Sequence, residues 1–164
     1  MSDFFQKGKV SVVVGGQFGS EAKGLVASSL ALEFMESGLD GIKLVSITNA
    51  GAQAGHTTML PNGAKFVCYH LPTMGVMVED SVIVLSAGSV IDPDLFVREI
   101  HGVAEALCVE PESIGRRVLV HFNAAVIRPE DQESEVGSVL KNRSTANGVG
   151  AAAARTMLSV ASPL

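Results

Sequence analysis

The residues most capable of chemistry lie in a glycine-rich segment near the start of the chain. It reads Gly15-Gly16-Gln17-Phe18-Gly19-Ser20-Glu21-Ala22-Lys23-Gly24 and follows Lys9–Val14, an apolar, β-branched run that predicts a buried strand. A strand-to-helix loop can surround an anion with backbone N–H groups, and glycines permit the close approach. Lys23 would add a charge within reach of a phosphate oxygen. The segment therefore predicts a phosphate-binding loop, although a tight turn alone would show the same glycines.

The spacing in this loop differs from that of the common P-loop. That motif places Gly directly before the lysine and Ser or Thr directly after it, whereas Lys23 stands between Ala22 and Gly24. A generic phosphate-loop kinase is therefore the less favoured interpretation. Ala22 must also adopt a negative φ or store backbone strain.

Strands and helices alternate along the rest of the chain. The helix expected at Ala22–Glu36 has Val26, Leu30 and Phe34 on one face. The other expected elements are strands at Leu44–Ile47, Val82–Leu85 and Val118–Phe122, a hairpin formed by Thr57–Leu60 and Lys65–Tyr69 around Asn62-Gly63, and a helix after the Asp92-Pro93 cap with Phe96, Ile100, Val103 and Leu107 on one face. The alternation predicts an α/β fold, with a largely parallel sheet flanked by helices.

Four segments, in order over nearly the whole chain, resemble motifs of the adenylosuccinate synthetase family. They are Gln17–Gly24 for the G-D-E-G-K-G loop, Gln53–Thr57 for N-A-G-H-T, Gly88–Pro93 for G-x-G-V-x-x-x-P, and Ser144–Ala152 for T-T-x-x-G-x-G-P-A. The resemblance implies that residues 1–164 are the N-terminal part of one domain with that family's P-loop-NTPase-like fold, here incomplete. We expect the chain to be incomplete for turnover, because the family's aspartate-binding loop and donor-base region come later.

The resemblance also implies a reaction and a set of site residues. Members of the family phosphorylate the purine O6 with a nucleoside triphosphate, and the amine of L-aspartate then displaces phosphate at C6. By resemblance Ser20, His56 and Lys23 are catalytic, and Mg²⁺ binds to Ser20 and to the carbonyl of Gly55. The triphosphate would contact Gly19, Ser20, Glu21, Ala22, Lys23, Gly24, Gly55, His56 and Thr57, and the purine monophosphate Ser20, Lys23, Gln53, Ala54, Ser144 and Thr145.

Position 20 bears on the choice of purine. Most of the family has Asp where this chain has Ser20, and a serine hydroxyl needs an activating partner before it can serve as a base. Phage aminoadenylosuccinate synthases, which resemble this family, carry Q-F-G-S here and join aspartate to dGMP. Amination of dGMP is therefore favoured over GTP-dependent amination of IMP. A catalytically inactive nucleotide-binding fragment is the third interpretation, and the donor could be ATP, dATP or GTP.

The resemblance further implies a homodimer, because the family places a residue of the neighbouring subunit near the substrate phosphate. Arg155 is a candidate for that residue. The other three histidines, His70, His101 and His121, are expected to be surface or structural residues.

Composition limits the possible partners and environment. Hydrophobic residues make up 47% of the chain and the net charge is −5, with no Lys/Arg block, which argues against a nucleic-acid partner. No apolar run approaches the ~20 residues that span a bilayer, and the start does not resemble a signal peptide. We therefore expect no membrane partner and a cytoplasmic location, which would be the host cytoplasm if the gene is a phage gene.

Two further sets of residues have structural interpretations. Cys68 and Cys108 are expected to be reduced core residues. The acidic cluster Glu130, Asp131, Glu133 and Glu135 beside Arg128 is expected to form a solvated helix face.

Overall fold

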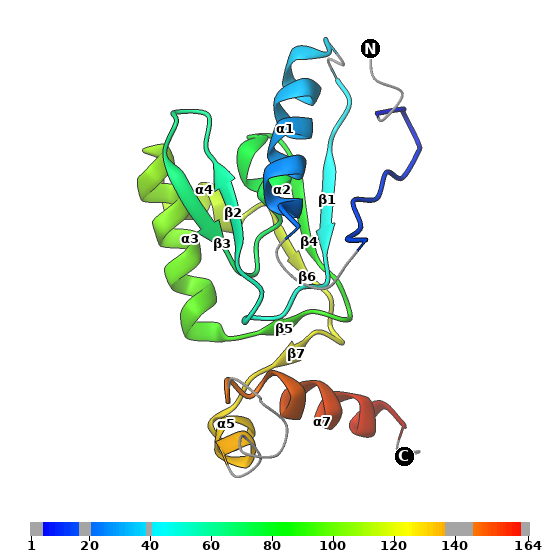
Figure 1. Cartoon of the computed structure of the whole chain (residues 1–164), viewed down its shortest axis with the longest axis vertical. Coiled ribbons are helices and arrows are strands. Elements are labelled where there is room, and N and C mark those ends of the chain that lie inside the picture. Colours follow the sequence, from blue (N-terminus) through cyan, green and yellow to red (C-terminus); the bar gives the residue numbers. More distant parts are fainter. Residues whose placement is uncertain (1–4, 17–20, 39–40, 137–145, 162–164) are drawn as a thin grey trace.

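The computed structural model describes residues 5–16, 21–38, 41–136 and 146–161 (Figure 1). Its helices are α1 (Lys23–Glu36), α2 (Thr73–Met77), α3 (Pro93–Leu107), α4 (Pro111–Gly115), α5 (Pro129–Val136) and α7 (Val149–Ala161). Its strands are β1 (Val45–Thr48), β2 (His56–Met59), β3 (Lys65–Cys68), β4 (Val82–Leu85), β5 (Val90–Ile91), β6 (Val118–Val120) and β7 (Ala125–Val126). None of the described helices is both long and apolar enough to cross a membrane.

The central sheet is parallel, with strand order β1-β4-β6, so the predicted α/β class is confirmed. One face of this sheet turns Ser46, Ile83 and Leu85 into the interior. The main core joins that face to the β2–β3 hairpin and to three helices. Its buried members are Leu60, Cys68, Leu71, Val76, Ile83, Val103, Ala104 and Ile114.

A second, smaller packing unit lies at the carboxyl end of the sheet. There β5 pairs with β7 in parallel, and α5 and α7 lie beneath them in Figure 1. Its buried apolar side chains are Ala52, Val90, Ala125, Ile127 and Ala152. This unit joins α7 to the segment that leads into β2.

Several local predictions are confirmed. The hairpin turns at Gly63, whose φ of +83° requires glycine, and β2 pairs antiparallel with β3. The strand at Val82–Leu85 has the predicted bounds. Asp92 caps α3, because its carboxylate accepts a hydrogen bond from the Leu95 N–H at 3.0 Å.

The prediction of a buried strand at Lys9–Val14 is wrong. This segment pairs with no strand in the described residues, and Val10, Val12 and Val14 are 87%, 68% and 76% exposed. β-branched residues favour an extended backbone, but a strand needs a neighbour that completes its hydrogen bonds. The segment, shown in dark blue in Figure 1, is drawn as irregular chain and not as a strand.

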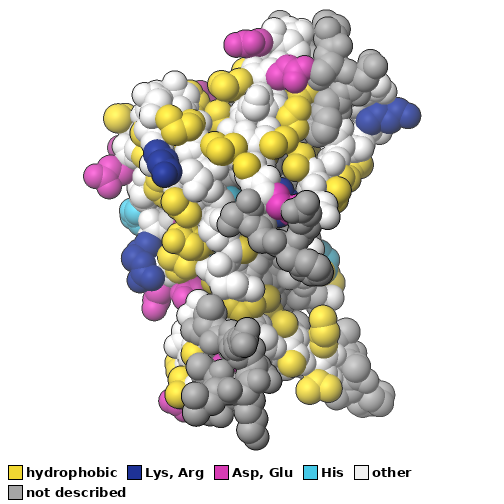
Figure 2. All heavy atoms as spheres, viewed as in Figure 1, with side chains coloured by type: hydrophobic (Ala, Val, Ile, Leu, Met, Phe, Trp, Pro, Cys, Tyr) yellow, Lys and Arg dark blue, Asp and Glu magenta, His cyan; other side chains and the backbone are white. Residues whose placement is uncertain are grey.

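The predicted buried face of the first helix is also wrong in part. Val26 is 46% exposed, and the residues that α1 buries are Gly24, Ser28 and Ala31. Small residues at this spacing allow the helix to approach β2 and α2 closely. Figure 2 accordingly shows apolar side chains scattered over the outer face of the region that carries α1 and the hairpin.

The acidic cluster is the predicted solvated face only in part, because Glu130 and Glu133 are exposed but Asp131 and Glu135 are not. Asp131 and Glu135 are buried, because both carboxylates bind groups of the α7 region. Asp131 forms two hydrogen bonds with the Arg155 guanidinium, at 2.7 and 3.1 Å. Glu135 accepts the N–H groups of Gly148 and Ala151. These contacts attach α5 to the start and middle of α7.

The expectation that both cysteines are core residues holds only for Cys68. The thiol of Cys68 is fully buried, and burial raises its pKa. Cys108 is exposed and has a left-handed backbone conformation (φ 56°) at the end of α3, so it terminates a helix instead of filling the core.

Candidate functional site

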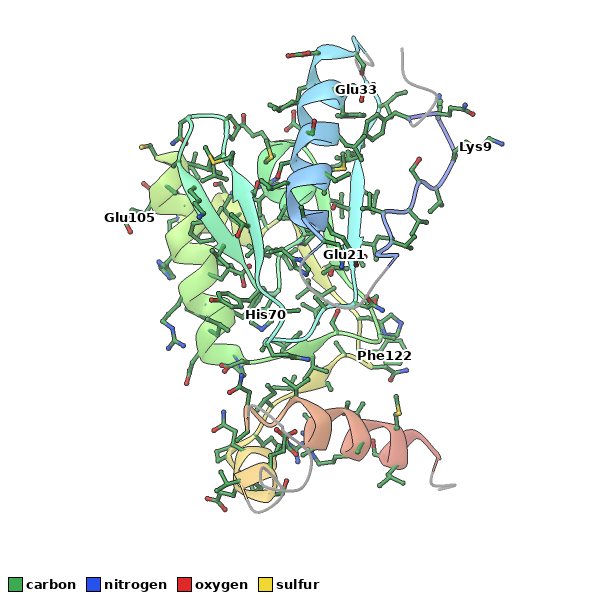
Figure 3. All side chains as sticks on the ribbon, in the orientation of Figure 1. Lys9, Glu21, Glu33, His70, Glu105 and Phe122 are labelled. Carbon is green, nitrogen blue, oxygen red and sulfur yellow. The ribbon has the colours of Figure 1, made fainter. Side chains whose placement is uncertain are left out.

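The N-terminal turn of α1 carries the described half of the predicted phosphate-binding loop. Ala22 is the N-cap residue of this helix and has φ 57° and ψ 26°, which is the strained alternative that the sequence left open. The Lys23 ammonium lies 3.3 Å from a carboxylate oxygen of Glu21, and the lysine side chain is about one-third exposed. Figure 3 labels Glu21 at this end of α1. The lysine is therefore accessible while it is paired with a carboxylate of its own loop.

The glycine at position 24 brings this turn against the strand that begins with His56. A Cβ atom on Gly24 would lie 2.6 Å from the Thr57 carbonyl oxygen and 3.3 Å from the His56 carbonyl carbon. Real side chains do not approach so closely, so only glycine fits without displacement of the helix. The structure thus places the first and second predicted motifs in direct contact.

His56, at the start of β2, is half-buried at this contact. Its pKa is lowered from the ordinary value of 6.5, first because burial removes water from the imidazole and second because the positive charge of Lys23 disfavours protonation. The negative charge of Glu99 acts weakly in the opposite direction. At neutral pH the imidazole is therefore uncharged and can donate one N–H hydrogen bond.

Glu99 is a residue near the site that the sequence analysis missed. It is only 4% exposed, and its carboxylate accepts the backbone N–H groups of Tyr69, His70 and Leu71. The carboxylate also lies 2.8 Å from His70 Nδ1, while His70 Nε2 accepts the Asp92 N–H. A signal was available, because position 99 falls on the apolar face of the predicted helix, where a charged residue needs buried partners.

His70 is therefore a satisfied core residue, as predicted (Figure 3), and His101 and His121 are exposed. Because the Nε2 atom of His70 accepts a backbone hydrogen bond, the proton of the imidazole resides on Nδ1 and is donated to Glu99. This arrangement joins the end of β3 to the start of α3.

The segment before β2 brings part of the last predicted motif to the same region. The Ala54 N–H donates to the Gly51 carbonyl and closes a turn. A Cβ atom on Gly51 would meet the side chains of Gln53 and Val149, at 2.5 and 3.1 Å. The N-terminal end of α7 therefore lies beside Gln53. Gly19, Ser20, Ser144 and Thr145, which were predicted to bind nucleotide or to react, lie outside the described residues.

Arg155 does not have the free guanidinium that an intersubunit contact would need. The side chain donates to Asp131 and, at 2.7 Å, to the Val126 carbonyl of its own chain. The hydrogen bonds from Arg155 hold the pKa of Asp131 below its ordinary value of 3.8. Arg155 therefore stabilises the small packing unit.

The described part of the site fits a magnesium ion that shares nucleotide phosphates. Gly55 is exposed and directly precedes His56, and its backbone carbonyl is a hard oxygen donor. Among the described residues no cluster of three or more His, Cys, Asp or Glu side chains could form a metal cage. A single protein oxygen such as this carbonyl suits Mg²⁺, because Mg²⁺ commonly takes one or two protein oxygens and completes its shell with phosphate and water.

Comparison with known proteins agrees with the geometry. A family model described as adenylosuccinate synthetase matches residues 12–161. The chain belongs to the adenylosuccinate synthetase family. Members of this family are ligases that form a C–N bond, and the predicted family is confirmed.

Relatives of two kinds match to a similar degree. The adenylosuccinate synthetase of Thermococcus onnurineus is 30% identical over 153 residues, which is 92% of this chain and 41% of that protein. The N6-succino-2-amino-2'-deoxyadenylate synthase of Salmonella phage PMBT28 is 34% identical over 144 residues, 88% of this chain and 36% of that protein. The chain thus spans about two-fifths or less of the length of these relatives.

Two solved structures share the fold. The cyanophage S-2L succinoaminodeoxyadenylate synthetase, bound to dGMP and dATP as an energy donor, has a TM-score of 0.60 and 29% identity and covers 87% of this chain and 36% of its own. A fully ligated adenylosuccinate synthetase from Plasmodium falciparum has a TM-score of 0.64 and 25% identity over 88% of this chain and 32% of its own.

Proposed function

We propose that this chain provides the phosphate-handling part of a purine-nucleotide:aspartate ligase whose purine substrate is dGMP. The observation that carries the proposal is the contact between Gly24 and the strand that begins with His56, which places an accessible lysine beside an uncharged imidazole. The product would be 2-aminoadenylosuccinate. The donor would be a nucleoside triphosphate, namely ATP, dATP or GTP.

The described residues have distinct parts in the first step. The γ-phosphoryl group passes from the triphosphate to purine O6 as the N1 proton leaves, and negative charge accumulates on the transferring oxygens. His56 would donate an N–H hydrogen bond to that group, and Lys23 would exchange Glu21 for a phosphate oxygen. Mg²⁺, held by the Gly55 carbonyl and by Ser20, supplies charge neutralisation when bound. The amine of aspartate would then attack C6 and lose a proton, and the C6–O6 bond would break as inorganic phosphate leaves with O6.

The preference for dGMP rests on position 20. A hydroxyl is smaller than a carboxylate, and guanine carries an exocyclic amine beside N1 that needs such room. Ser20 would contact the base and assist removal of the N1 proton. The similarity to phage synthases that are named for a 2-amino-2'-deoxyadenylate product supports this choice.

Amination of IMP is the second candidate, because archaeal adenylosuccinate synthetases match the chain about as well. The two candidates differ in the mass of the product, so a direct competition separates them. The chain would be incubated with equimolar dGMP and IMP, L-aspartate, Mg²⁺ and ATP, dATP or GTP, alone and as a polypeptide extended to the length of its relatives. Products would be identified by mass spectrometry.

We expect succinylated 2-aminopurine nucleotide in the extended polypeptide, with activity depressed in both Ser20→Asp and His56→Ala. A succinylated adenine nucleotide would instead show that the purine substrate is IMP. Nucleotide binding that survives His56→Ala, with no product at either length, would identify a catalytically inactive nucleotide-binding module.

A further inference from the structure

Three hydroxyl groups lie buried between the two halves of the proposed site. They belong to Ser28 on α1, Thr58 on β2 and Thr73 at the start of α2, and each residue is at most 5% exposed. The main core elsewhere is largely apolar, so a polar group here needs its own partners. All buried side-chain polar atoms of the described residues have such partners.

The hydroxyls form one connected set of hydrogen bonds. Ser28 Oγ donates to the Gly24 carbonyl at 2.7 Å, and Thr73 Oγ1 donates to the same carbonyl at 3.3 Å. Ser28 Oγ and Thr58 Oγ1 are 2.6 Å apart. Thr58 Oγ1 also lies 3.4 Å from Met77 Sδ. The set therefore connects the first turn of α1 to β2 and to α2.

The residues of this network are close in sequence to both proposed functional residues, Lys23 and His56. Gly24, whose carbonyl receives two of the bonds, directly follows Lys23. Thr58 is two residues beyond His56 on the same strand, so their side chains share one face. Hydrogen bonds fix direction as well as distance, whereas apolar packing alone would let a helix slide along a strand.

We propose that Ser28, Thr58 and Thr73 are positioning residues, whose hydroxyl network sets the placement of Lys23 relative to His56. This inference deepens the proposed function and rests on it for its catalytic meaning. The placement itself is a property of the free protein and can be measured without any nucleotide.

The readout is the contact between Gly24 and His56 in the free protein, followed by NMR as the nuclear Overhauser effect between the Gly24 Hα and His56 Hβ protons. A Cβ atom on Gly24 would lie 3.3 Å from the His56 Cβ atom, so these protons are close in the wild-type chain. Loosening the network would move the first turn of α1, with Lys23, away from β2. Thr58→Val and Ser28→Ala should therefore each weaken this effect severalfold, and the double variant should weaken it less than the product of the two factors.

Matched variants separate positioning from simple stability. Thr58→Ser retains the hydroxyl and should keep the wild-type effect. Ser81→Ala removes another buried hydroxyl, one that bonds the Gly75 carbonyl and Arg117 away from the site, and should lower stability without changing the contact between Gly24 and His56. A folded Thr58→Val or Ser28→Ala protein with an unchanged nuclear Overhauser effect, or an equal loss in Ser81→Ala, would overturn the proposal.

A second measurement tests whether the network matters for phosphate binding. Binding of inorganic tripolyphosphate with Mg²⁺, measured by isothermal titration calorimetry, should weaken severalfold in Thr58→Val and recover in Thr58→Ser. If the wild-type chain itself does not bind tripolyphosphate, the proposed function fails, while the result of the NMR comparison stands by itself.

Discussion

The Lys23 ammonium interacts with two neighbours, the carboxylate of Glu21 and the imidazole of His56. The Glu21 carboxylate pairs with its ammonium, and the same ammonium lowers the pKa of His56. A phosphate group that replaced Glu21 would leave the lysine charge in place but reduce its effect on the imidazole. Protonation of His56 and occupancy of the loop are therefore linked.

This linkage predicts the outcome of removing the charge. Lys23→Met should raise the His56 pKa, because a nearby cation disfavours the imidazolium form. NMR titration of the His56 Cε1–H signal would measure it. Lys9→Met, a change of the same type in the exposed N-terminal segment, should have no effect. Equal titration curves for Lys23→Met and the wild type would show that the lysine does not act on His56.

A second prediction concerns the backbone of Ala22. Its left-handed conformation is costly for alanine and free of strain for glycine, so Ala22→Gly should stabilise the protein by about 0.5–1 kcal/mol. Ala27→Gly, in the middle of the same helix, should destabilise it by a similar amount, about 0.5–1 kcal/mol. Urea unfolding would compare the two. Destabilisation by both substitutions would mean that Ala22 is not strained.

At the scale of elements, the sequence predicted correctly those features that depend on neighbouring residues. The hairpin follows from Asn62-Gly63 and the start of α3 from Asp92-Pro93, because turn geometry and capping depend on neighbouring residues. Whether Lys9–Val14 forms a strand was not predictable in this way, since strand pairing depends on a distant segment. The buried carboxylates Asp131 and Glu99 were not predictable for the same reason. The ion-pair partner of Asp131, Arg155, is 24 residues away, and the backbone partners of Glu99 are 28 to 30 residues away.

The junction of α5 and α7 gives a prediction for acid conditions. Arg155 lowers the Asp131 pKa, so the pair stabilises the fold fully above the ordinary pKa of 3.8 and loses its effect as pH falls through the lower value in the folded protein. Arg155→Gln should therefore lower the urea midpoint at neutral pH, and the gap to wild type should shrink below pH 3.8. Arg98→Gln, on the exposed face of α3, should leave the midpoint unchanged. A gap that is constant with pH would assign the effect to packing.

At the scale of the whole molecule, the central sheet has one open face. Val45 and Ile47 on β1 and Leu119 on β6 are 52%, 62% and 58% exposed. Ile47 is registered with Val84, and Val84 with Leu119, so these side chains form one patch across three strands. Parallel sheets are normally covered on both faces.

This open face should govern the solution behaviour of the isolated chain. An exposed apolar patch binds the dye ANS and promotes self-association, so Ile47→Thr combined with Leu119→Thr should reduce both, and threonine retains a good strand propensity. Fluorescence titration and sedimentation velocity would measure the changes. Val97→Thr, which removes a single exposed apolar side chain from α3, should alter neither. Undiminished dye binding in the double variant would place the accessible apolar surface elsewhere, and the exposed side chains of α1, including Leu25 and Leu32, would then be the next to substitute.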